Sequence, residues 1–120
     1  MKKQAVAAEE LKSLVVKALD DLKAVDIRVL DVAKITSITD YMIIASGNSD
    51  RHVRSLVRNV VEEAKANDFP PIGVEGEADG QWGLVDLGDV VVHVMLPRVR
   101  EFYQLEKLWS IEDVADKAST

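Results

Sequence analysis

The fold is decided by Gly80-Gln81-Trp82-Gly83-Leu84-Val85-Asp86-Leu87-Gly88-Asp89-Val90-Val91-Val92-His93-Val94-Met95-Leu96, a stretch in the C-terminal half of this 120-residue chain. It predicts two strands joined by a tight turn at Leu87-Gly88-Asp89, because Gly and Asp tolerate the backbone angles of a short hairpin loop. The second strand, Val90 to Leu96, is apolar at every position but one. A strand without polar alternation is buried on both faces, so we expect it inside a sheet that helices cover on both sides. The first strand is mixed and sets Trp82 beside two glycines and a carboxylate, which indicates a place for a partner to dock.

Two segments before this hairpin have the apolar spacing of amphipathic helices. In the first, from Glu9 to Lys23, apolar residues recur at helical offsets along one stripe. The second begins after Ser49 or Asn48 as its N-cap, repeats the same spacing and ends near Asn67. Apolar or β-branched runs predict strands over residues 27–33, 41–45 and 72–74. The short connection between the first two of these strands allows them to pair antiparallel.

A third helix is expected after Pro97, from Arg98 to Trp109, with buried side chains at Phe102, Leu105 and Leu108 or Trp109. The resulting order, αββαβββα, predicts an α/β (α+β) fold: a single domain with a mixed sheet of about five strands packed by helices. We expect this domain over residues 9–109, between a flexible N-terminus of residues 1–8 and a polar C-terminal tail of residues 110–120.

The composition is that of an ordinary soluble protein, with 48% apolar and 30% charged residues. The absence of cysteine excludes disulfides and thiolate metal sites. The apolar run near the N-terminus ends at Glu9, too early for an export signal, and no segment is long enough to span a bilayer. These features predict a cytoplasmic protein that does not associate with membranes.

Negative charge is concentrated in one part of the chain. The net charge is −6, which argues against general binding to phosphate backbones. From Ala66 to Pro97 there is no Lys or Arg, whereas this range contains Asp68, Glu75, Glu77, Asp79, Asp86 and Asp89. One interpretation is a solvated acidic surface. The other is a docking surface for a basic partner, because complementary charge speeds encounter and fixes orientation.

Three patterns that could carry chemistry are better explained by structure. The turn Ser46-Gly47-Asn48-Ser49 precedes a helix but lacks the Lys of a phosphate-binding loop, so capping is favoured. Asp86 and Asp89 flank the hairpin turn, where Asp beside Gly is common, and turn roles are favoured over a metal pair. His52 and His93 alone do not form a convincing zinc site. Residue chemistry therefore favours a binding module without cofactors over an enzyme.

Five segments, in order and at matching spacing, resemble the ribosomal silencing factor family, also called the Iojap-related family. They are Ser37-Ile38-Thr39-Asp40-Tyr41-Met42-Ile43-Ile44, Ser49-Asp50-Arg51-His52-Val53, Gly73-Val74-Glu75-Gly76, the run from Trp82 to His93, and the run from Arg100 to Trp109. The resemblance covers residues from about Leu11 to Ser110.

This resemblance implies a translational repressor with a nucleotidyltransferase-like fold that lacks the catalytic motifs. It implies binding to the large ribosomal subunit through the fourteenth protein of the large-subunit series, uL14, on the intersubunit face. Joining of the small subunit would then be blocked sterically, notably when nutrients are scarce. The docking residues implied for this chain are Trp82, Leu84 and Asp86, with Glu75 and Met95 as further candidates.

Several alternatives stay open at this point. Trp82 could be a core residue instead of an anchor, and Arg100, Tyr103 and Glu106 could fix the third helix against the sheet. An exposed apolar strand face would favour a homodimer of the free protein, which would compete with ribosome binding. The alternative function is a nucleotidyltransferase-like enzyme acting on a nucleotide or phosphate substrate.

Overall fold

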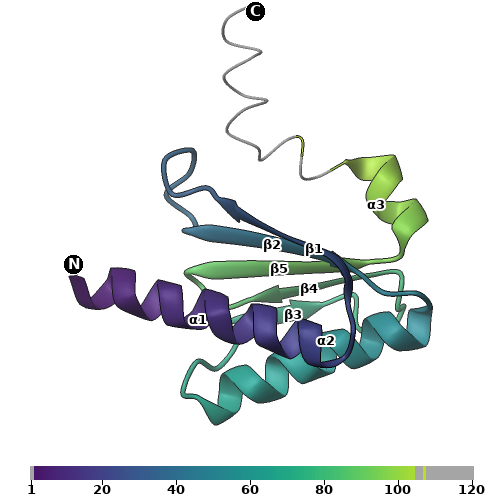
Figure 1. Ribbon diagram of the computed structural model, residues 1–120, viewed down its shortest axis with the longest axis horizontal. Helices are drawn as coiled ribbons and strands as arrows, with labels where there is room; N and C mark the ends of the chain where they lie inside the picture. The colour runs from purple at the N-terminus through teal and green to yellow at the C-terminus, as the bar shows by residue number, and fades with distance from the viewer. Residues whose placement is uncertain (1, 105–106, 108–120) are drawn as a thin grey trace, which may run out of the picture.

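The computed structural model describes residues 2–104 and residue 107. Its elements follow the predicted order αββαβββα (Figure 1). They are α1 (Lys2–Asp21), β1 (Val25–Asp31), β2 (Tyr41–Ser46), α2 (Asp50–Ala66), β3 (Gly73–Glu75), β4 (Trp82–Asp86), β5 (Val90–Met95) and α3 (Pro97–Tyr103).

The five strands form one mixed sheet in the order β1-β2-β5-β4-β3. Only β2 and β5 run parallel, and the other neighbouring pairs, including the predicted β1–β2 pair, are antiparallel. The hairpin turn between β4 and β5 has Gly88 at φ +86°, and Oδ1 of Asp86 accepts a hydrogen bond from Gly88 N at 2.9 Å. The predicted central strand is therefore confirmed, with β5 between β2 and β4.

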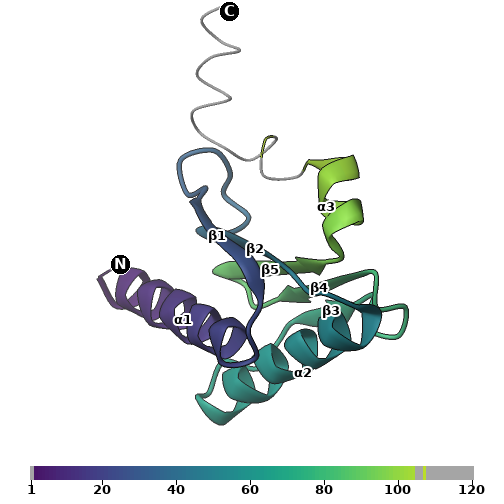
Figure 2. The ribbon, with the colours of Figure 1, turned by 45° about the vertical axis from the view of Figure 1, so that its right-hand side comes forward.

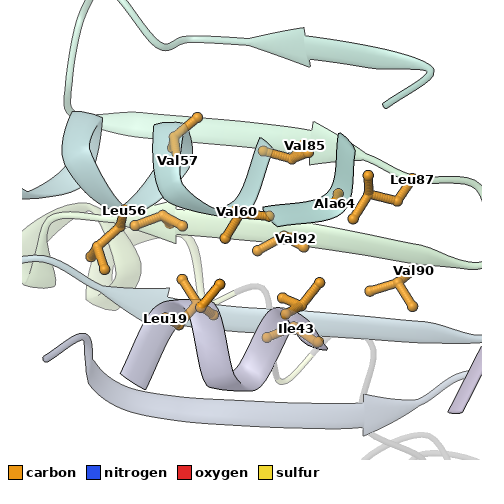
Figure 3. Packing of buried hydrophobic residues seen from close by; sticks show 14 of the residues in the cluster. Leu19, Ile43, Leu56, Val57, Val60, Ala64, Val85, Leu87, Val90 and Val92 are labelled. Carbon is orange, nitrogen blue, oxygen red and sulfur yellow. The ribbon is translucent and has the colours of Figure 1, made fainter. Parts of the chain in front are cut away.

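Both long helices cover the same face of the sheet, as the two ribbon views show (Figures 1 and 2). Leu19 of α1 and Val60 of α2 belong to one buried cluster with Ile43 of β2 and Val92 of β5 (Figure 3). A Cβ on Gly83 would lie 2.5 Å from a methyl carbon of Val57, so this glycine allows close packing of α2 on β4.

The expectation that helices cover both faces is wrong for most of the second face. Among the described residues, the seven-residue α3 is the one helix on that side, near one end of the sheet (Figures 1 and 2). Its Arg100 is buried and donates from Nη1 to Oγ of Ser46 at 3.0 Å, and Nη2 lies 3.5 Å from the Asp26 carboxylate. A small second cluster on this face replaces the missing helix layer; its buried members are Val32, Met42, Ile44 and Met95.

Two helices differ from their predicted bounds. α1 begins at Lys2 instead of Glu9, and Ala8, a turn before Leu11, is already buried. α3 ends at Tyr103, because Gln104 takes a left-handed conformation at its C-cap. The burial predicted for Phe102 is wrong: its side chain is 78% exposed, and the helix is held to the sheet through Arg100 instead. Leu105, Leu108 and Trp109 lie outside the described residues.

Candidate functional site

The sequence-predicted docking residues lie on one face of the sheet, opposite α1 and α2. Trp82, Leu84 and Asp86 alternate with inward-facing Gly83 and Val85 along β4, so they project to the same side. Trp82 is paired with Met95 of β5, and Leu84 with Glu75 of β3, which places all five on this side. We call this surface the open face; its central residues are Glu75, Trp82, Leu84, Asp86, Val91, His93 and Met95.

These residues differ in how much surface they offer. Glu75 is exposed, and Trp82, Leu84 and Asp86 are half-buried. Met95 is fully buried within the second cluster, against which Trp82 packs. Met95 therefore supports the open face from beneath, whereas the other four reach its surface.

Trp82 is held by two neighbours. Its indole Nε1 donates a hydrogen bond to Nδ1 of His93 at 2.9 Å. Its ring lies 4.9 Å from the ring of Tyr103 in α3, at an interplanar angle of 50°. Trp82 thus caps the second cluster while part of its surface stays accessible, so packing and docking roles are compatible in one residue.

His93 is the buried polar member of the open face. It is 7% exposed, and burial lowers the pKa of its imidazole from 6.5 to about 4. The ring is therefore neutral at pH 7. Because the indole N–H can only donate, Nδ1 must be the acceptor and the proton belongs on Nε2. His93 is thus a hydrogen-bonded residue on the face of the sheet.

An open pocket of about 270 Å³ adjoins the Trp82 ring, lined by Glu75, Gly76, Trp82 and Leu84. Gly76 has φ +76°, and a Cβ there would lie 2.0 Å from the backbone oxygen of Trp82. Glycine is required at this position, because it lets the loop after β3 approach β4 closely. The pocket combines apolar walls with a carboxylate, a combination that suits the long side chain of Lys or Arg.

The acidic stretch does not all point to one side. Glu75 and Asp86 lie on the open face, although Oδ1 of Asp86 also accepts the Gly88 bond of the hairpin turn. The Glu77 carboxylate lies 3.9 Å from Nη2 of Arg58 in α2. Glu75 is thus the exposed carboxylate nearest the Trp82 pocket.

The alternative chemical sites resolve into structural roles. Oγ of Ser49 accepts from His52 N at 3.1 Å as the N-cap of α2, so the capping interpretation is confirmed. His52 joins the start of α2 to the end of α1, because its Nε2 lies 2.7 Å from the Leu22 carbonyl oxygen. Within residues 2–104 and 107, no three His, Asp or Glu side chains form a group that could hold a metal ion. In the same part of the chain no helix is long and apolar enough to cross a membrane.

A family model described as "Ribosomal silencing factor during starvation" matches residues 5–120. A curated relative from Chromobacterium violaceum, named ribosomal silencing factor, is 46% identical over 101 residues. That match covers 84% of this chain and 83% of the relative.

Two further comparisons extend this likeness. A crystal structure of a Chromobacterium violaceum protein superposes with a TM-score of 0.83 at 46% identity, covering 84% of each chain. A mouse protein named "Mitochondrial assembly of ribosomal large subunit protein 1" is 37% identical over 107 residues. In that case the match covers 87% of this chain and 47% of the mouse protein.

Proposed function

The chain belongs to the ribosomal silencing factor family, and from that premise we propose that it represses translation by docking its open face on the large ribosomal subunit. In this proposal the partner is the ribosomal protein uL14 on the intersubunit face. The bound protein then blocks joining of the small subunit sterically. Such an action occurs in the cytoplasm and uses binding alone, without catalysis or a cofactor.

One observation carries the proposal: Trp82 lies half-buried at the start of β4, on the sheet face opposite α1 and α2. Leu84 extends the apolar surface, and Glu75 and Asp86 supply carboxylates around it. An aromatic anchor with a polar rim is the usual composition of a binding hot spot. The arrangement suits a protein partner with a matching apolar and basic patch.

Charge supports a ribosomal protein as the partner in preference to bare RNA. The net charge of −6 opposes general attraction to phosphates. Ribosomal proteins are typically basic, so the exposed Glu75 and the neighbouring pocket would attract a Lys or Arg side chain of the partner. The name of the mouse relative favours the large subunit as the particle that is bound.

The experiment is co-sedimentation of the purified protein with separated large and small subunits at physiological salt, together with a subunit-joining assay. We expect binding to the large subunit only, and inhibition of joining that follows the bound fraction. Naked ribosomal RNA is the control ligand. Equal affinity for naked RNA and for the large subunit, or binding to the small subunit alone, would reject the proposal. The mass of the free protein is measured in parallel, because a homodimer through the open face would compete with docking.

A further inference from the structure

We propose that His93 is a positioning residue for docking: its Nδ1 holds the Trp82 indole in the orientation that a partner meets. The inference rests on the proposed function, since it assigns a role within the open face. It adds a residue that itself offers little surface, being 7% exposed.

The sheet register brings the two rings together. Trp82 pairs with Met95 and His93 pairs with Leu84, so Trp82 and His93 are diagonal neighbours on the same face of the β4–β5 hairpin. Diagonal neighbours are within reach of aromatic side chains. The indole therefore points toward β5, and its Nε1 donates a hydrogen bond to Nδ1 of His93 at 2.9 Å. The two ring centroids are 5.8 Å apart.

The imidazole is a fixed acceptor. His93 lies between Ile44 of β2 and Leu84 of β4 as their cross-strand neighbour, and it is buried. A neutral ring with its proton on Nε2 always presents the Nδ1 lone pair to the indole. The acceptor thus does not depend on solvent or on a mobile side chain.

The indole is restrained on two sides before any partner arrives. The His93 bond fixes one edge, and the Tyr103 ring, 4.9 Å away, limits the other direction of movement. A side chain that is already ordered loses less conformational freedom on binding. Affinity should therefore depend on the acceptor at His93, although His93 supplies almost none of the contact surface.

The test compares two variants of similar shape, His93→Leu and His93→Asn. The Asn Oδ1 is attached to the same carbon position as Nδ1 and can accept the indole bond, whereas Leu cannot. We expect His93→Leu to weaken large-subunit binding by about fivefold, the usual worth of one hydrogen bond. The His93→Asn variant should stay within about twofold of the parent. Thermal melting of both variants separates this effect from loss of folding.

A double-mutant cycle and an NMR measurement make the test independent of stability. In a Trp82→Phe background the indole N–H is absent, so His93→Leu should have no further effect on affinity. In the parent, the nitrogen shifts of His93 should identify the Nε2–H tautomer, and the Trp82 indole proton should exchange slowly.

The proposal is overturned if the parent carries the Nδ1–H tautomer, or if His93→Leu and His93→Asn bind alike. It is also overturned if the effect of His93→Leu persists without the indole N–H. Normal binding by Trp82→Ala would instead reject the open face as the docking surface, and with it the proposed function. Weak binding by Trp82→Ala together with normal binding by His93→Leu rejects only the positioning role.

Discussion

Trp82 can form part of the open face because its apolar ring and its indole N–H have different partners. Its ring packs against the cluster that contains Met95, and its N–H bonds to His93. Trp82 and His93 could each be singled out from the sequence, but the hydrogen bond between them could not be predicted. It joins positions that are not direct partners, and it depends on the register that the turn at Gly88 sets.

At the same scale, His93 makes stability depend on pH. Its pKa is about 4 in the folded protein and 6.5 in the unfolded chain, so only the unfolded chain binds this proton between those values. The contribution of the neutral His93 to the free energy of unfolding should therefore be complete above pH 6.5. It should be lost as the pH drops toward about 4. The loss attributable to His93 should be on the order of 3 kcal/mol.

Urea unfolding across this pH range checks the prediction, with His93→Asn as the control. Carboxylates contribute to both proteins alike, so the difference between the two pH profiles isolates the imidazole. Parallel profiles would mean that His93 titrates normally in the folded protein.

Glu75 and Glu77 provide a matched pair of charges. Glu75→Lys should weaken large-subunit binding by roughly fivefold, mainly through a slower association rate and more strongly at low salt. Glu77→Lys should change binding little, because Glu77 lies beside Arg58 on the helix side of the molecule. Association kinetics at two salt concentrations decide between them. Equal effects would indicate that overall charge, and not the Trp82 pocket, guides the encounter.

Among the elements, those with local signals were predicted best. The five strands and α2 were predicted nearly in full, because the apolar or β-branched runs of the strands and the Ser49 cap and apolar spacing of α2 lie within the segments themselves. The length of α3 was not, because it depends on the left-handed Gln104 and on a buried Arg that reaches Ser46. Because the buried residue of α3 is Arg100, it adds nothing to the apolar periodicity from which a helix is predicted.

The loop between β3 and β4 should be sensitive to a single methyl group. Gly76→Ala should lower the free energy of unfolding by about 1–3 kcal/mol, since the residue would combine positive φ with a contact against the Trp82 carbonyl. Gly73→Ala is the control, because a Cβ there meets nothing within 4 Å. Chemical denaturation and large-subunit affinity are measured for both variants. Equal stability of the two would mean that the loop does not need glycine to approach β4.

At the scale of the whole molecule, the two long helices, α1 and α2, lie on one side of the sheet. The apolar run of β5 predicted two covered faces, and β5 is indeed buried on both. On the second face, however, Trp82, Val99 of α3 and the small cluster around Met95 provide that burial instead of a long helix. The open face therefore stays accessible along β3 and β4, next to the buried strand β5. The candidate docking residues came from the family resemblance, whereas their shared face follows from the register.

The most direct test of the docking surface is Trp82→Ala, measured for large-subunit affinity and for inhibition of subunit joining on the same folded protein. We predict a loss of affinity of roughly thirtyfold, as expected for a hot-spot residue, with inhibition of joining falling in step. Circular dichroism and melting confirm that the variant is folded. A folded Trp82→Ala protein that binds the large subunit normally and still blocks joining would contradict the account.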